Sequence, residues 1–195
     1  GFVFFPASPR HVSLEQAAAL AAQVKGRAVK TALSVDADDE ALAAIVAALR
    51  PDLLQLHGHE PPERVAAVKR RFGLPVMKAL PIAERADLAA VAAYEGVADR
   101  ILFDARPPKE ATRPGGLGRR FDWRLLERVE TRTPFMLSGG LDATNVAEAL
   151  AITRAAGVDV SSGVERAPGQ KDVEKIRAFV RAARQAAAAR AAAEG

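Results

Sequence analysis

The chain alternates short apolar runs with amphipathic helical segments, and this alternation constrains its fold more than any other feature. The apolar runs are rich in Val, Leu and Ile without intervening polar residues, which is typical of parallel strands covered on both faces. We predict strands at 2–5, 28–35, 53–57, 75–80, 100–105, 134–139 and 157–162. The predicted helices span 13–24, 38–49, 61–72, 84–94, 121–129, 144–154 and 172 onward. Ser13 and Gln16 have the spacing of a capping box at the start of the first helix.

Alternating units of this length form either a doubly wound sheet or a (β/α)8 TIM barrel. A doubly wound fold usually carries a glycine-rich fingerprint after its first strand, whereas here that position holds PASPR. Most predicted strands instead end in polar residues or glycine, as in LQLHGHE, LFDARPP and DVSSGVE. Because a barrel builds its active site from the loops that follow its strands, this pattern favours the α/β barrel.

The chain shows seven strand–helix units, although a barrel of this type needs eight. We therefore predict a (β/α)8 TIM barrel with seven of its eight βα units visible. Seven strands would leave two edges of unpaired backbone groups, and one βα segment of roughly 30 residues in front of Gly1 would close the barrel. On this interpretation 1–195 is a single domain that is incomplete at its N-terminus, and 185–195 is a frayed tail of Ala and Arg.

The composition narrows the class of protein. No apolar run is long enough to cross a membrane, and the absence of cysteine excludes disulfides and fits a reducing cytoplasm. The net charge of +4 suggests nucleic acid, but the basic residues are spread over many helices and aromatic residues make up only 5%. A nucleic-acid surface would need a basic stripe interleaved with stacking side chains. We expect neither a nucleic-acid nor a membrane partner.

Two turns rich in glycine and serine follow the last two predicted strands. Their residues are Ser138, Gly139 and Gly140 in the first turn, and Ser161, Ser162 and Gly163 in the second. Barrels commonly bind phosphate with these two loops, and small side chains let backbone N–H groups approach an anion closely. The alternative is that the glycines only shape turns, which a single such loop would favour. The two loops together predict a phosphate site.

Single polar residues at other strand ends are candidates for chemistry. Asp104 ends the otherwise apolar strand ILFD, where a carboxyl group could act as a general acid or could cap a neighbouring segment. His57 and Gln55 share one face of their strand by alternation, and a structural role is the commoner one for such a histidine. Arg10 could clamp a carboxylate with its planar fork, or could be an isolated surface residue.

Other kinds of site have little support in the sequence. His11, His57 and His59 are the only histidines, and they do not have the spacing of metal ligands. No elbow motif supports a serine nucleophile with a His/Asp pair. We therefore expect no metal and no cofactor.

With these residues in view, the chain resembles the phosphoribosylanthranilate isomerases of tryptophan biosynthesis. The motifs that carry the resemblance are, in family order, GFVFFPASPRHVS, LLQLHGHE, ILFDARPP, GGLGRRFDW, LSGGLDATNVAEAL and VDVSSGVERAPGQKD. The resemblance implies a cofactor-free Amadori rearrangement of N-(5-phosphoribosyl)anthranilate to 1-(2-carboxyphenylamino)-1-deoxyribulose 5-phosphate. It also implies a protein of the cytoplasm, a small phosphorylated substrate as partner, and a monomer or homodimer.

The resemblance assigns roles to residues by motif. Asp104 would be the general acid, and the loop from Gly115 to Gly118 would close over the substrate. The implied substrate-binding residues are Arg10, Gln55, His57 and Asp159, and the implied phosphate-binding residues are Gly139, Gly140, Ser161, Ser162 and Gly163.

One departure from the family pattern concerns the general base. The family uses a cysteine at the end of its first barrel strand, and this sequence contains no cysteine. We therefore expect the chain as given to be inactive. The alternatives to the isomerase are an inactive fragment or phosphate-binding relic of the barrel, and another sugar-phosphate isomerase. Among the latter, the histidine-pathway isomerase looks like a half-barrel repeat, and no repeat pairs 1–100 with 101–195.

Overall fold

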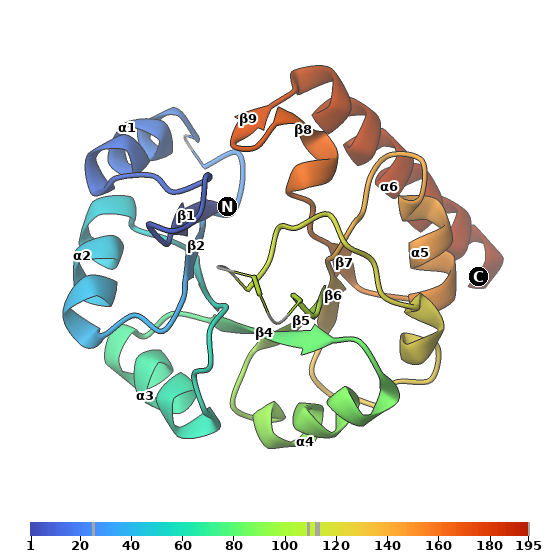
Figure 1. The fold of residues 1–195 in the computed structure, drawn as a ribbon, viewed down its shortest axis with the longest axis horizontal. Coiled ribbons are helices and arrows are strands. Elements are labelled where there is room, and N and C mark those ends of the chain that lie inside the picture. Colours follow the sequence, from blue (N-terminus) through green and yellow to red (C-terminus); the bar gives the residue numbers. More distant parts are fainter. Residues whose placement is uncertain (25, 109, 112–113, 195) are drawn as a thin grey trace.

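Seven parallel strands form one curled sheet in which each strand pairs with the next along the chain (Figure 1). The computed structural model describes residues 1–24, 26–108, 110–111 and 114–194. The strands of the sheet are β1 (Phe2–Phe4), β2 (Thr31–Ser34), β3 (Leu53–Leu56), β4 (Val76–Ile82), β5 (Arg100–Ala105), β6 (Phe135–Leu137) and β7 (Gly157–Val158). All seven predicted strands are present, and the longest ladder joins β4 to β5.

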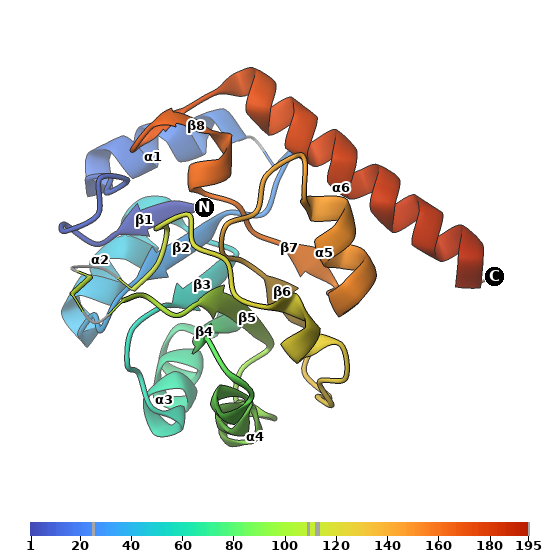
Figure 2. The same cartoon turned by 45° about the vertical axis from the view of Figure 1, so that its right-hand side comes forward.

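Helices surround the strands as an outer ring (Figures 1 and 2). They are α1 (Leu14–Val24), α2 (Asp39–Leu49), α3 (Pro62–Phe72), η1 (Arg85–Ala90), α4 (Val91–Tyr94), η2 (Trp123–Leu126), α5 (Val146–Thr153), η3 (Ser162–Val164) and α6 (Val173–Glu194), where η marks a 3-10 helix. The capping box predicted before α1 is confirmed. The Gln16 N–H donates to Ser13 Oγ at 3.1 Å, and the Ser13 N–H donates to Gln16 Oε1 at 2.9 Å.

Strand β5 shows how the sheet separates the inside of the barrel from the helical layer. Ile101, Leu102 and Phe103 are all fully buried. Ile101 and Phe103 pack with the outer cluster that includes residues of α5 and α6, whereas Leu102 belongs to a small inner cluster with Met77 of β4. Because side chains alternate along a strand, the next inward position after Leu102 is that of Asp104. The strand therefore delivers its only carboxyl group to the barrel interior.

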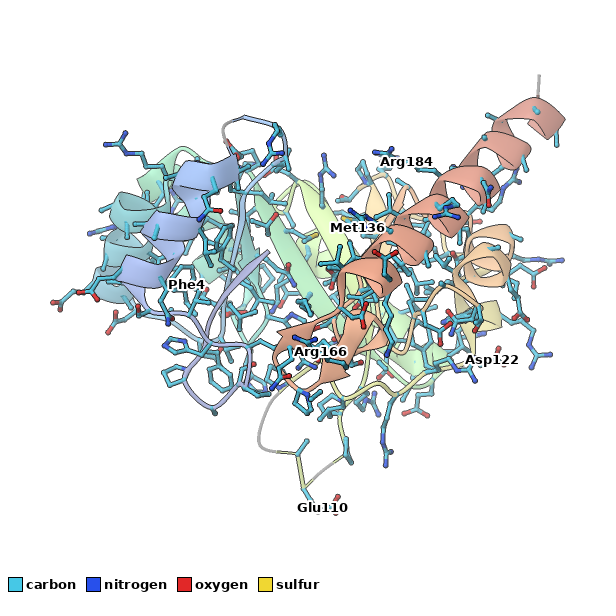
Figure 3. The ribbon with its side chains drawn as sticks, turned by 90° about the horizontal axis from the view of Figure 1, so that it is seen from above. Phe4, Glu110, Asp122, Met136, Arg166 and Arg184 are labelled. Carbon is cyan, nitrogen blue, oxygen red and sulfur yellow. The ribbon has the colours of Figure 1, made fainter. Side chains whose placement is uncertain are left out.

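A short antiparallel hairpin joins β7 to α6 and was not predicted. Its strands are β8 (Glu165–Ala167) and β9 (Gln170–Lys171). In Figure 3, Arg166 of this hairpin lies nearer than Met136 of β6 to the side of the molecule on which Glu110 is labelled. Gly169 has a φ of +80°, and a Cβ atom there would overlap the Pro9 carbonyl oxygen. The hairpin is therefore packed directly on the turn that follows β1.

Three predicted elements differ from the structure. The helix expected at 121–129 is only the 3-10 turn η2, because its buried side chains, Trp123 and Leu126, anchor a single turn. The helix expected at 84–94 is mostly the 3-10 helix η1. The strand expected at 157–162 ends at Val158, where the chain leaves the sheet to form the loop before η3.

The C-terminal segment continues α6 as a helix up to Glu194. We expected a frayed tail over 185–195, and Gly195 lies outside the described residues. Ala and Arg are strong helix formers, which explains the helix in this segment. Fraying of this end stays a prediction, as does the eighth βα unit. None of the described helices combines the length and apolar character needed to cross a membrane.

Candidate active site

A cavity of about 440 Å³ opens at the carboxyl ends of the strands. It is the place where the loops after β1, β3, β5, β6 and β7 meet. The family resemblance assigns a catalytic, substrate-binding or phosphate-binding role to ten residues, and nine of them line the cavity: Arg10, Gln55, His57, Asp104, Gly139, Gly140, Asp159, Ser161 and Ser162. Gly163 is not among the lining residues, and a Cβ atom there would overlap the carbonyl oxygen of Leu141. The structure thus gathers residues that are up to 152 positions apart in the sequence, as parallel strands with a shared carboxyl end require.

Asp104 is held in a short hydrogen-bonded chain with two residues of the β3 end. Its Oδ1 accepts the Ala105 N–H at 2.9 Å, and its Oδ2 lies 3.2 Å from Nε2 of His57. The Nδ1 atom of His57 lies 3.0 Å from the amide nitrogen of Gln55. Because an amide nitrogen only donates, Nδ1 accepts, and the ring hydrogen of neutral His57 sits on Nε2, facing Asp104. Gln55 therefore sets the histidine tautomer.

Asp159 supplies a second carboxyl group, from the loop after β7. Its Oδ2 accepts a hydrogen bond from Ser138 Oγ at 3.3 Å, and its N–H donates to the Leu137 carbonyl at 2.8 Å. Burial raises the pKa of Asp159 above its ordinary value, and the charge of Asp104 adds to the rise. Like charges that share a site resist simultaneous ionisation. The cavity can therefore keep a proton on one of its two carboxyl groups under conditions in which an exposed aspartate has lost it.

Arg10 reaches the cavity from the turn after β1. Its Nε and Nη2 donate to the two carboxylate oxygens of Glu165, each at 2.8 Å. Lys171 lies 2.9 Å from the same carboxylate. Burial by itself would raise the pKa of Glu165, but the hydrogen bonds and charges of Arg10 and Lys171 lower it to about 2. Arg10, which we expected to bind a substrate carboxylate, thus has one edge of its guanidinium occupied by Glu165.

The two loops expected to bind phosphate lie side by side. Gly140 has a φ of +65°, a conformation that strongly favours glycine, and a Cβ atom there would overlap the Arg120 side chain. Within the described residues, the backbone N–H groups of Gly140, Ser162 and Gly163 have no hydrogen-bond acceptor. Unpaired N–H groups on adjacent turns are suited to an anion. The glycines therefore shape the turns and leave backbone N–H donors available to an anion.

A glycine-rich segment, 114–118, covers the cavity. A Cβ atom on Gly115 would lie 2.6 Å from Oδ2 of Asp104 and 3.0 Å from Nε2 of His57. A Cβ atom on Gly116, which has a φ of +69°, would lie 2.5 Å from Nη1 of Arg10. Only the absence of side chains allows the backbone to come this close to both groups.

Glu165 and the buried pair of Lys78 and Glu60 were not predicted from the sequence. Nζ of Lys78 lies 2.7 Å from Oε2 of Glu60 and donates to the Gly58 carbonyl at 2.6 Å, next to His57. The lysine within the apolar run VMKAL could have predicted this pair, because a buried lysine needs a partner of opposite charge.

Within the described ranges, no three His, Asp or Glu side chains gather as metal ligands would.

Comparison with known proteins assigns the chain to a family. The model of a family described as N-(5'phosphoribosyl)anthranilate (PRA) isomerase matches residues 1–182. The chain belongs to this isomerase family.

Individual members of the phosphoribosylanthranilate isomerase family agree with this assignment. A protein of Rhodopseudomonas palustris (strain BisA53) named N-(5'-phosphoribosyl)anthranilate isomerase is 70% identical over 184 residues, which are 94% of this chain and 84% of that protein. The namesake from Nitrobacter winogradskyi is 65% identical over 186 residues, 95% of this chain and 83% of that protein.

Solved structures of the family share the fold. The crystal structure of the phosphoribosyl anthranilate isomerase from Thermotoga maritima has a TM-score of 0.82 at 33% identity, covering 95% of this chain and 87% of that one. A crystal structure of the isomerase in complex with reduced 1-(o-carboxyphenylamino)-1-deoxyribulose 5-phosphate has a TM-score of 0.79 at 30% identity, covering 95% and 86%. The curled parallel sheet with its ring of helices is therefore a barrel-type α/β fold of this family.

Proposed function

We propose that the protein is an isomerase of tryptophan biosynthesis that converts N-(5-phosphoribosyl)anthranilate to 1-(2-carboxyphenylamino)-1-deoxyribulose 5-phosphate. The observation that carries this proposal is the position of Asp104. It is a buried carboxyl group, 7% exposed, hydrogen-bonded to His57 in a cavity that also holds Arg10 and two loops with unpaired N–H groups. Membership of the isomerase family supports the same reaction.

The charged groups of the cavity match the two anionic ends of this substrate. The free edge of Arg10 suits the anthranilate carboxylate, because a guanidinium fork binds a carboxylate through two parallel hydrogen bonds. The N–H groups around Gly140 and Ser162 suit the phosphate. Asp104 lies on the cavity wall, where a Cβ atom on Gly139 would be 3.2 Å from its Oδ1 and a Cβ atom on Gly115 would be 2.6 Å from its Oδ2. The ribose ring would lie beside it.

The reaction needs proton transfers and requires neither an oxidant nor a reductant. Asp104 would protonate the furanose oxygen, which opens the ring to a Schiff base between C1 and the anthranilate nitrogen. A general base would then remove the C2 proton to give an enolamine, which tautomerises to the ketone. His57 would stabilise Asp104 after it has given up its proton, because its Nε2–H donates to the carboxylate. Asp159, whose pKa is raised, is a second source of a proton in the cavity.

The general base is the role that has no assigned residue in this chain. The family resemblance implies a cysteine, and the sequence contains none. The expected inactivity of the chain is not supported by its relatives, which are named as isomerases, and we propose that the chain turns over its substrate. The cytoplasm stays the proposed compartment, and a monomer or homodimer stays the proposed assembly. One solved structure is described as monomers of the dimeric isomerase from Thermotoga maritima.

Two measurements on the full chain test the proposal separately. Titration with the reduced product analogue tests the site without requiring turnover, and we expect micromolar or tighter binding that competes with inorganic phosphate. Chromatography of a reaction with N-(5-phosphoribosyl)anthranilate tests turnover. Product formation would show that a residue other than cysteine acts as base. If the analogue does not bind at all, the proposed function is wrong.

A further inference from the structure

One ion-pair network joins Arg10 to the loop after β7, and Glu165 is at its centre. Its carboxylate accepts both hydrogen bonds from Arg10, and its Oε1 lies 2.9 Å from Nζ of Lys171. The same Lys171 ammonium donates to the Ser161 carbonyl at 2.9 Å. Glu165 therefore connects Arg10 to the loop of Ser161 through Lys171.

The network determines which edge of the Arg10 guanidinium faces the cavity. A guanidinium has five N–H bonds, and Glu165 takes the Nε–H and one Nη2–H. The remaining edge consists of both Nη1–H bonds and the second Nη2–H, which is enough for a second bidentate carboxylate. Nη1 points toward the segment that covers the cavity, since a Cβ on Gly116 would lie 2.5 Å from it.

Burial and charge make this arrangement rigid. The side chains of Arg10 and Glu165 are 10% and 4% exposed. The Lys175 ammonium also donates to the Glu165 backbone carbonyl at 2.8 Å. The hairpin that carries Glu165 packs on the turn that carries Arg10, through Gly169 and Pro9. Held in this way, the Arg10 side chain loses little conformational freedom when a second carboxylate binds.

We propose that Glu165 is a positioning residue that determines how strongly the site selects a carboxylated substrate. Glu165 occupies the edge of Arg10 formed by Nε and Nη2, and so it presents the edge formed by Nη1 and Nη2 to the substrate carboxylate. Through Lys171 it also keeps that second edge at a fixed separation from the phosphate loop. This proposal rests on the proposed function, because it needs a ligand with a carboxylate at one end and a phosphate at the other.

The test compares two stable ligands by isothermal titration calorimetry on the full chain. One is the reduced product analogue, and the other is the same compound with an unsubstituted phenyl ring in place of the carboxyphenyl ring. For the wild-type protein we expect the carboxylated ligand to bind at least about 30-fold more tightly, since one charge-assisted bidentate pair is lost with the carboxylate. The ratio of the two dissociation constants is the readout.

In Glu165→Gln we expect this ratio to fall at least tenfold, while the phenyl ligand binds about as in the wild type. Lys171→Met is the matched control, because it leaves the bidentate pair between Arg10 and Glu165 in place. It should weaken both ligands by a similar factor through the Ser161 loop and keep the ratio. Glu165→Asp, which keeps the charge but shortens the side chain, should give an intermediate ratio and replaces Glu165→Gln if that variant does not fold.

Two results would count against the proposal in different ways. If the wild type discriminates between the ligands and both Glu165 variants discriminate equally well, Glu165 has only a structural role and the inference is wrong. If the wild-type protein binds neither ligand, the proposed function itself fails, and the inference fails with it.

Discussion

Nε2 of His57 lies 3.2 Å from Oδ2 of Asp104, although 47 positions separate the two residues in the sequence. Both side chains are largely buried, at 10% and 7% exposure. In such surroundings a hydrogen bond to the ionised carboxylate is stronger than in water. The pair is therefore suited to a step in which Asp104 gives up a proton inside the cavity.

Replacing Asp104 by Asn should lower kcat by about 10²- to 10⁴-fold relative to the wild type, since ring opening needs a proton donor on the furanose oxygen. Binding of the reduced product analogue should change little, because Asn has nearly the same shape. The control is Asp122→Asn, which alters an exposed carboxylate at the start of η2. A near-normal kcat for Asp104→Asn would show that Asp104 only caps its loop.

Adding a methyl group to each of two neighbouring glycines should affect different kinetic constants. In Gly115→Ala the new Cβ meets Asp104 and His57, so we expect mainly a loss in kcat. In Gly116→Ala it meets Nη1 of Arg10 at a φ of +69°, so we expect mainly a rise in KM. Steady-state kinetics of the two variants side by side separate the effects, and identical changes in both would contradict this division of the covering segment.

Replacing Gly140 by Val should raise KM for the phosphorylated substrate, because the side chain would obstruct the N–H groups of the loop after β6. Gly96→Val is the control. Gly96 also has a positive φ, at +75°, but open space surrounds it, so the variant carries similar backbone strain away from the site. Equal affinity of the wild type for analogues with and without phosphate would contradict the assignment of this loop.

Replacing Asp159 by Asn should stabilise the protein at pH 8, because the pKa of Asp159 is raised in the folded state. Ionisation of this carboxyl group therefore opposes folding. The penalty is absent below the unfolded-state pKa and grows as the pH rises through the folded-state value. Urea unfolding of variant and wild type at pH 4 and pH 8 measures it, and the difference in stability should be larger at pH 8.

The control for this experiment is Asp142→Asn, which should have the opposite effect. Hydrogen bonds from Thr144 lower the pKa of Asp142, so its ionised form stabilises the fold above the unfolded-state pKa, and this stability is lost as the pH falls through the folded-state value. Asp142→Asn should therefore destabilise the protein at pH 8. If both variants shift stability in the same direction, the explanation by ionisation is wrong.

Replacing Lys78 by Met should destabilise the protein by about 3–5 kcal/mol, because it leaves the Glu60 carboxylate buried without its cation. The double variant with Glu60→Leu should recover much of this loss, since two apolar side chains can replace a buried pair. Chemical unfolding of the two variants and the wild type gives the comparison. A single variant as stable as the wild type would show that water reaches Glu60.

The position of Asp104 could be predicted because it depends on local pattern alone. An apolar strand that ends in one carboxyl group, read with the alternation of side chains, places that group at the mouth of the barrel. The same logic found Gln55 and His57. The partner of Arg10 could not be predicted in this way, since it lies 155 positions away on a hairpin whose strands are only two and three residues long. The partner of the buried Lys78 could not be predicted for a related reason, because Glu60 lies 18 positions earlier, on the loop between β3 and α3.

The contact between Gly163 and the carbonyl oxygen of Leu141 ties the loop after β7 to the loop after β6. The loop after β7 cannot gain a side chain at Gly163 unless the loop after β6 moves. In laboratory evolution toward a different phosphorylated ligand, randomising one loop alone would mostly yield variants in which the two loops no longer pack together to bind the phosphate. A library that varies both loops together, and keeps glycine at 163, would sample far more functional combinations for the same number of clones.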